Sequence, residues 1–186
     1  LQTPKTTKIF FARNHNYWFP FISSSFFPFL FPYLSKQMSL ILSSSHFQKI
    51  FSHGETSYPN ECCGLLLGHK NQQTKTVMEI WPAENAWQTE ADEYWPEQTE
   101  FTEEKRYAIS PKLMLKAMKS ARERHLSIIG IYHSHPDHPA IPSEFDRTYA
   151  WPEYSYIILS VEKGKTIDFL CWSLDENNQF QPEKII

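Results

Sequence analysis

Apolar residues recur with a helical period in the first patterned segment of the chain. Phe47, Ile50 and Phe51 fall at positions i, i+3 and i+4, so their side chains share one face of a short helix. Ser45 has the residue type of an N-cap, and Gly54 has that of a helix end. The pattern therefore predicts a short amphipathic helix between these two residues.

The clearest helical pattern lies in residues 110–125. Ser110 is a preferred N-cap residue, and Pro111 suits the first helical position. The basic end of the segment complements the partial negative charge at a helix C-terminus. A shorter helix is predicted for residues 143–151, beginning at Ser143 after a proline. The apolar face of the longer helix is formed by Met114, Ala117, Met118 and Ala121.

Five segments have the short apolar or alternating pattern of strands. Turn residues at 71–73 and at 163–165 join four of them into two hairpins. Strands that alternate with helices favour an α/β fold, with a mixed central sheet and helices packed on it. The predicted strands cover residues 62–70, 74–83, 126–135, 154–162 and 165–174.

Two segments do not fit this pattern. Residues 84–109 are acidic and aromatic without a clean period, so we expect a loop or excursion there. Residues 1–37 are dense in phenylalanine and interrupted by prolines, which disfavours a membrane-spanning helix. We interpret residues 1–37 as an extension outside the fold, disordered or a misassigned start, and residues 38–186 as the folded domain. A membrane-targeting role, or packing of the extension onto the domain, is the alternative.

Composition narrows the class of protein. The 186 residues are 41% hydrophobic and 21% charged, which suits one globular domain with a sizeable core. The formal net charge is −3 and no basic stripe is present, so we expect neither nucleic acid nor a membrane surface as a partner. Cys62, Cys63 and Cys171 lack the spacing of a disulfide framework. We expect them to be small buried hydrophobes in a cytoplasmic protein.

His133 and His135 end the strand predicted at 126–135. Side chains along a strand alternate between its two faces, so both imidazoles point to the same face and can bind one divalent ion. Ten residues, three of them prolines, separate His135 from Asp146 and can return the chain to the same point. Two imidazoles and a carboxylate would leave the fourth tetrahedral position open, as in a catalytic zinc site.

Each part of this pattern also has a plainer interpretation. Ser143 to Asp146 form an S-x-x-D capping box, in which Asp146 only returns a hydrogen bond to the helix start. A His-x-His pair on a strand can arise by coincidence. His138, within the loop, offers a fourth ligand, but a closed site would leave no position for a catalytic water. The combination of strand, prolines and donor residues favours a metal site.

The stretch GIYHSHPDHPAIPSEFD, residues 130–146, resembles the signature of the JAMM (MPN+) metalloproteases, H-x-H-P followed by S-x-x-D. The similarity extends to NECCGLLLG, to residues 107–136 and to YSYIILSV. These segments look like the first strand, long helix, zinc strand and following strand of the short bacterial members. The resemblance covers roughly residues 40–175, fits least well at 84–109 and does not include 1–37.

The resemblance implies the fold of that family, which is related to that of the cytidine deaminases, and a role for each matching position. The zinc ligands fall on His133, His135 and Asp146, with one zinc ion per chain. The catalytic glutamate falls on Glu61, and a serine that can stabilise the oxyanion falls on Ser143. A carboxylate beside the metal can take a proton from water and hand it to the leaving amine. Without the resemblance, Glu61 would be interpreted as a surface residue and Ser143 as a helix cap.

The resemblance also implies hydrolysis at the C-terminal tail of ubiquitin-like proteins, with ubiquitin-like sulfur carriers as partners of the short bacterial members. A zinc-free scaffold or protein-binding module of the same fold is an alternative from another class, since members that lack the ligands act in that way. Metal content distinguishes the two. A nucleobase deaminase would need H-x-E followed by P-C-x-x-C, and the sequence contains neither.

Overall fold

The computed structural model describes residues 38–98 and 100–186, so the predicted extension 1–37 lies outside the described residues. No helix within these two ranges is long and apolar enough to cross a membrane. Their secondary-structure elements are, in chain order, β1 (Ser39–Ile41), α1 (Ser44–Ser57), β2 (Cys63–Lys70), β3 (Thr74–Ala83), α2 (Trp87–Tyr94), the 3-10 helix η1 (Pro96–Gln98), α3 (Pro111–Glu123), β4 (Ser127–Pro136), α4 (Glu144–Tyr149), β5 (Ser155–Glu162), β6 (Lys165–Leu174), β7 (Phe180–Pro182) and β8 (Lys184–Ile185).

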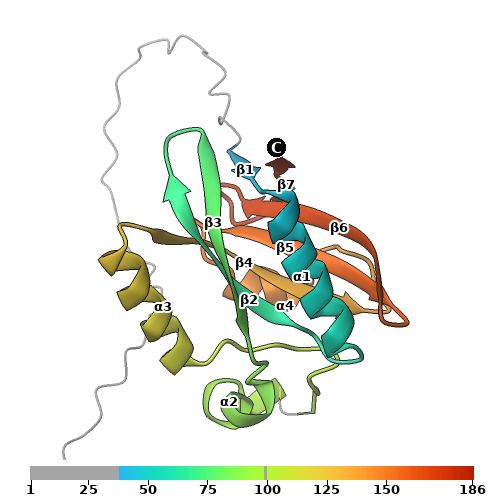
Figure 1. Ribbon diagram of the computed structural model, residues 1–186. Coiled ribbons are helices and arrows are strands. Elements are labelled where there is room, and N and C mark those ends of the chain that lie inside the picture. The colour runs from blue at the N-terminus through green and yellow to red at the C-terminus, as the bar shows by residue number, and fades with distance from the viewer. Residues whose placement is uncertain (1–37, 99) are drawn as a thin grey trace, which may run out of the picture. The chain divides into compact units, whose positions relative to one another are not determined.

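The strands of the described residues form one mixed sheet in the order β7-β6-β5-β4-β2-β3-β1-β8 (Figure 1). β4 and β5 run parallel, as do β1 and its neighbours β3 and β8, and the other pairs are antiparallel. The predicted α/β fold with a mixed central sheet is therefore confirmed. Both predicted hairpins are present, and Lys163 and Gly164 in the second turn have φ angles of 48° and 76°. β1, β7 and β8 were not predicted, because strands this short have too few residues to show a period.

β2 shows how the sheet separates two hydrophobic layers. Leu66 belongs to a buried cluster with Ile50 of α1. Leu65 and Leu67 belong to a second cluster, with Ala117 of α3. Neighbouring residues of a strand point to opposite faces, so α1 and α3 cover opposite faces of the sheet (Figure 1). The three cysteines are buried and free, as predicted.

Helix α1 differs from the prediction at both ends. Its N-cap is Ser43, not Ser45, because the Ser43 hydroxyl accepts the N–H of His46 while the His46 side chain accepts the N–H of Ser43. The helix continues past Gly54, which does not end it. Gly54 is buried, and a Cβ atom there would lie 3.3 Å from a methyl group of Val161 on β5. Glycine at this position therefore allows close packing of the helix on the sheet.

Helix α3 begins as predicted, because the Ser110 hydroxyl accepts the N–H of Leu113 at 3.3 Å. Its predicted apolar face is only partly correct. Ala117 and Ala121 are buried, whereas the Met118 side chain is 52% exposed. Met118 lies about 100° around the helix from Ala117, which carries it past the edge of the contact with the sheet.

Residues 84–109 are the main correction to the predicted fold. They contain α2 and η1 where a loop was expected. Trp87, Ala91 and Trp95 recur at i, i+4 and i+8, the first two are buried, and the two tryptophan rings stack with centroids 5.2 Å apart. Phe145 of α4 packs against the same cluster. The helical period is therefore present in the sequence, although the acidic residues around it obscure it.

Candidate metal centre

His133 and His135 lie near the C-terminal end of β4, and their imidazoles share one face of the sheet, with Nε2 atoms 3.0 Å apart. His133 is fully buried, and the Tyr107 ring stacks on it with centroids 4.6 Å apart. Ser134 points the other way, and its hydroxyl accepts the N–H of Cys62 at 2.8 Å. This hydrogen bond ties β4 to the chain that enters β2 and so fixes the direction of both imidazoles.

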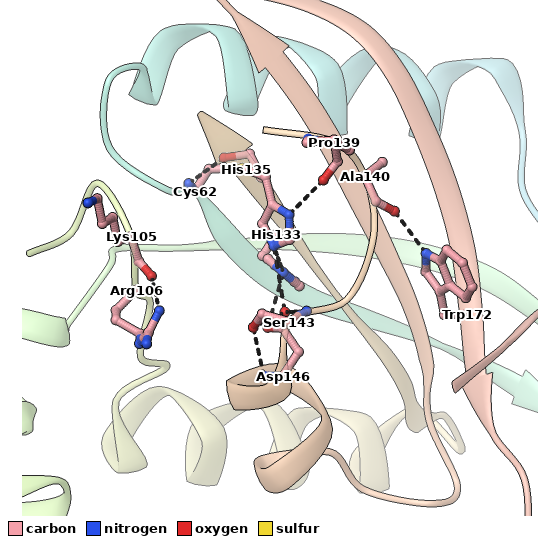
Figure 2. A network of polar contacts seen from close by, with 11 residues as sticks. Cys62, Lys105, Arg106, His133, His135, Pro139, Ala140, Ser143, Asp146 and Trp172 are labelled. Carbon is pink, nitrogen blue, oxygen red and sulfur yellow. Dashed lines mark hydrogen bonds and ion pairs between the residues drawn. The ribbon is translucent and has the colours of Figure 1, made fainter. Parts of the chain in front are cut away.

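The loop after β4 is hydrogen-bonded to β5 and β6, and Figure 2 shows its contact with Trp172 of β6. The N–H of Asp137 donates to the Val161 carbonyl at 2.9 Å, and the Ser160 hydroxyl donates to the His138 carbonyl at 2.7 Å. Further along, the indole N–H of Trp172 donates to the Ala140 carbonyl at 3.0 Å. These bonds return the chain to the C-terminal end of β4, where α4 begins.

Asp146, in the first turn of α4, completes the donor set. Its Oδ1 lies 3.3 Å from Nε2 of His133, and its Oδ2 lies 3.6 Å from Nε2 of His135. The N–H and the hydroxyl of Ser143 both donate to Oδ2 at 2.7 Å, and the Asp146 N–H donates back to the hydroxyl at 3.1 Å. The capping box and the donor cluster are therefore made by the same residues, so the two interpretations of S-x-x-D are compatible.

The donor atoms of His133, His135 and Asp146 are spaced as ligands of one small divalent ion. They lie within 4.8 Å of one another, and their closest approaches run from 3.0 to 3.6 Å. Ligand atoms ~2.0 Å from a tetrahedral zinc ion would lie ~3.3 Å apart. The geometry of the three side chains thus fits such an ion.

The protonation of the donors also fits a metal. Nδ1 of His135 lies 2.9 Å from the Pro139 carbonyl, which can only accept, so Nδ1 carries the proton and Nε2 keeps its lone pair for a metal. Burial lowers the pKa of His133, although Asp146 acts in the opposite direction, and this favours the neutral ligating form. Burial raises the pKa of Asp146, but His133 and hydrogen bonds from His135 and Ser143 outweigh it and hold that pKa well below its usual range.

A cleft of about 320 Å³ opens beside the donor set. Glu61, His135, Ser143 and Asp146 all line it, and His133, the remaining predicted site residue, is buried next to them. The structure therefore brings the five residues together, although they come from β4, α4 and the chain that enters β2.

Glu61 is 7% exposed, so the interpretation of this residue as an ordinary surface glutamate is wrong. Burial raises the pKa of Glu61 well above its usual value, Asp146 adds to the rise and Arg106 opposes it. Burial thus favours the protonated form of this carboxyl group, and a carboxyl group whose pKa is raised by its surroundings is suited to general acid–base catalysis.

Asn85 ties the backbone of Glu61 to that of Arg106, which also lines the cleft. Its side-chain amide nitrogen donates to the carbonyls of Glu61 and Arg106 at 3.1 and 2.9 Å. Its amide oxygen accepts the N–H groups of Trp87 and Ala108 at 3.0 and 3.2 Å. This residue could not be predicted from the sequence, because all four bonds go to main-chain atoms and leave no side-chain pattern.

The chain that returns from α2 to α3 forms one wall of the cleft. The N–H of Glu61 donates to the Glu103 carbonyl at 2.7 Å, and Glu104 and Arg106 line the cavity. His138 lines the cleft as well, but its side chain is exposed and lies outside the donor cluster found among the described residues. The segment 84–109, predicted as a loop or excursion, thus contributes to the site.

Comparison with known proteins finds relatives along most of the chain. The family described as prokaryotic homologs of the JAB domain matches residues 43–174. A desampylase of Pyrococcus furiosus is 26% identical over 150 residues, 80% of this chain and 91% of that protein. A desampylase of Haloferax volcanii is 35% identical over 121 residues, 63% of this chain and 73% of that protein. A solution structure from Desulfitobacterium hafniense has a TM-score of 0.63 at 26% identity and covers 79% of this chain and 91% of that one.

A mixed sheet that carries two strand histidines and a helix-start aspartate beside one cleft defines a domain of the JAMM/MPN class, as the sequence motif predicted. Within that class, the chain belongs to the prokaryotic homologs of the JAB domain. The matched span begins at the N-cap of α1 and includes all five predicted site residues.

Proposed function

We propose that this protein is a zinc-dependent metallopeptidase. It would hydrolyse the peptide or isopeptide bond after the C-terminal tail of a ubiquitin-like (sulfur-carrier) protein. The observation that carries the proposal is the convergence of three metal-ligand atoms within 4.8 Å beside a buried glutamate on one cleft. Family membership and the name desampylase of two relatives support the reaction and the class of substrate. A cytoplasmic location stays a prediction.

His133, His135 and Asp146 would hold one zinc ion per chain. Two imidazole nitrogens and one carboxylate oxygen form a donor set that zinc favours, and they leave one tetrahedral position open. Zinc held in this way would polarise a carbonyl group and lower the pKa of a water molecule to ~7.

Glu61 is the proposed proton carrier. Its side chain lines the cleft with two of the proposed ligands, where it can accept a proton from the attacking water and deliver it to the leaving amine. Hydrogen bonds at both its N–H and its carbonyl hold its main chain in place. The carboxylate therefore starts from a fixed backbone, which limits the positions from which it can exchange a proton.

Ser143 is proposed to donate a hydrogen bond to the developing oxyanion. Its hydroxyl donates to Asp146 in the structure, and rotation about Cβ–Oγ would turn the proton toward the cleft that Ser143 lines. Loss of the hydroxyl bond to Asp146 should weaken metal affinity by ~10–100-fold, so Ser143→Ala is assayed with zinc in excess. Under that condition we expect it to keep its zinc and to lower kcat by ~10²–10³-fold. Loss of the cap should also lower the free energy of unfolding by ~1 kcal/mol.

Metal analysis, kinetics and thermal unfolding separate these effects of Ser143→Ala. Ser110→Ala is the matched control, because Ser110 caps α3 with a similar hydrogen bond and does not line the cleft. It should lose stability and keep its activity. If Ser143→Ala behaves in the same way as this control, Ser143 is a cap only.

The alternative is a zinc-free scaffold or protein-binding module of the same fold. The complete donor set argues against it, because a scaffold has no need of three converging ligands and a buried glutamate. A purified protein that binds a ubiquitin-like protein, contains no zinc and cleaves nothing would favour the scaffold.

We expect cleavage directly after an extended Gly-Gly tail and not at random in unfolded protein. The resemblance implies a narrow channel in which side chains larger than that of glycine would clash. Residues 84–104 include eight carboxylates, Glu84, Glu90, Asp92, Glu93, Glu97, Glu100, Glu103 and Glu104, and no Lys or Arg. These carboxylates would attract a substrate that carries basic residues beside its tail, and salt screens such attraction. The substrate should therefore associate faster at low salt than at high salt.

The test compares two fusions of a ubiquitin-like protein to a reporter, one with a Gly-Gly tail and one with bulky residues in place of the glycines, at low and high salt. Only the Gly-Gly fusion should be cleaved. Equal cleavage of both, or efficient digestion of casein, would leave a general zinc peptidase without tail specificity.

A further inference from the structure

Arg106 lines the cleft together with Glu61, Ser143 and Asp146, yet the proposed chemistry assigns it no role. It lies on the segment that leads from η1 to α3 and is half-buried. Figure 2 shows Arg106 and Trp172 on opposite sides of the proposed ligands in that view. A charged side chain at this place faces whatever occupies the cleft.

Two aromatic rings hold the Arg106 guanidinium in place. Its central carbon lies 4.0 Å from the ring centroid of Phe101 and 4.6 Å from that of Phe145. Both phenylalanines are anchored on Trp87, which is 1% exposed. The Trp87 indole N–H donates to the Phe101 carbonyl at 2.8 Å, and its ring packs edge-on against Phe145. The guanidinium is therefore positioned before any substrate binds, which reduces the entropy lost on binding.

Arg106 also lacks an anionic partner in the described part of the chain. Arg124 and Arg147 each pair with a glutamate, whereas no carboxylate of residues 38–98 or 100–186 lies within 4.0 Å of the Arg106 nitrogens. Its acceptors are neutral: the Lys105 carbonyl at 2.7 Å and the Gln98 side-chain oxygen at 3.5 Å. A guanidinium has five N–H donors, so donor capacity remains for a ligand.

We propose that Arg106 is a substrate-binding residue that donates hydrogen bonds to main-chain carbonyl oxygens of the extended tail in the cleft. This inference rests on the proposed function, since it takes that tail as the occupant. A neutral acceptor fits better than an anion, because the exposed side chain of Glu104 lines the same cleft and would repel a carboxylate. The planar fork of arginine can also reach two acceptors at once, which suits an extended peptide.

Asn85 connects this binding residue to the proposed proton carrier. Its one amide nitrogen donates to the carbonyls of both Glu61 and Arg106. The backbones of these two residues are therefore held at a fixed separation. A tail held by Arg106 would be placed in one register relative to Glu61, so Arg106 would help to select which peptide bond reaches the proposed ligands.

The test measures binding separately from turnover. Zinc-loaded Glu61→Gln protein should bind the Gly-Gly fusion without cleaving it. Adding Arg106→Ala to that protein should raise the Kd by ~10–150-fold, the range for hydrogen bonds to a charged group. Arg106→Lys keeps the charge without the planar fork and should recover only part of the affinity. Lys105→Ala removes a positive charge from the neighbouring position of the same cleft and should leave the Kd unchanged.

Zinc content and thermal unfolding check that each variant is loaded and folded. Equal Kd values with and without Arg106 would overturn the inference, and so would an equal loss in Lys105→Ala, which would indicate a general charge effect. If Arg106→Ala weakened binding only of fusions with an acidic side chain in the tail, Arg106 would bind a carboxylate and not main-chain carbonyl oxygens, which would contradict the inference. Cleavage is measured separately, in protein that retains Glu61. If that protein binds the fusion through Arg106 but does not cleave it, the proposed function is wrong and the inference about Arg106 still holds.

Discussion

Glu61→Gln is expected to retain its zinc and to lower kcat by ~10²–10⁴-fold, the usual contribution of general acid–base catalysis. Glutamine has nearly the size of glutamate, but its amide cannot take up a proton from water. Glu61 lies outside the donor cluster found among the described residues, so its replacement should not change the metal content. Metal analysis and steady-state kinetics on the Gly-Gly fusion check both parts of this expectation.

Glu104→Gln is the matched control for that experiment. Glu104 also lines the cleft, but its side chain is exposed. Its replacement removes one negative charge from the same cavity and should leave kcat close to that of the wild type. Near-normal turnover of Glu61→Gln would remove Glu61 from the mechanism and direct the search to Glu144 or to the acidic stretch at 84–109.

His133→Ala and Asp146→Ala should each lose most of the bound zinc, and turnover with it. A site with three protein ligands has no spare donor. Loss of a residue that only hydrogen-bonds to a metal ligand weakens metal affinity by ~10–100-fold. Loss of a ligand itself should therefore weaken it by more than ~10²-fold. Zinc content after dialysis against a weak chelator measures this directly.

Two further variants test whether the loss of zinc is specific to the proposed ligands. Asp146→Asn keeps an oxygen that can accept the capping hydrogen bonds of Ser143, so it should lose zinc with little change in the stability of α4. His138→Ala removes an exposed imidazole from the same cleft and should keep its zinc. Equal zinc binding by the wild type, His133→Ala and Asp146→Ala would show that the site lies elsewhere.

The donor set could be predicted from the sequence because it depends on local geometry. His133 and His135 share a face through strand alternation, and a loop with three prolines returns the chain to Asp146. The sequence could not decide whether Ser143 and Asp146 form a cap or a ligand site. In the structure the same atoms form the capping box and the donor cluster, so no local pattern could separate the two.

The walls of the cleft depend on contacts between residues that are distant in the sequence. Asn85 bonds to the main chain of Glu61 and Arg106, and the Tyr107 ring covers His133. Neither contact is encoded in a period or a motif. A glutamate before a strand is usually exposed, and Glu61 is buried only where the segment that returns from α2 packs beside it. The resemblance identified Glu61, whereas Asn85, Arg106 and Tyr107 required the tertiary structure.

The most direct test of a zinc-dependent cleavage site is a titration of zinc into metal-stripped wild-type protein during cleavage of the Gly-Gly fusion. The rate should rise in proportion to the added zinc and level off at one ion per chain, and His133→Ala should show no recovery. Cleavage at full rate without zinc, or one tightly bound zinc per chain with no cleavage of the fusion, would contradict the proposed function.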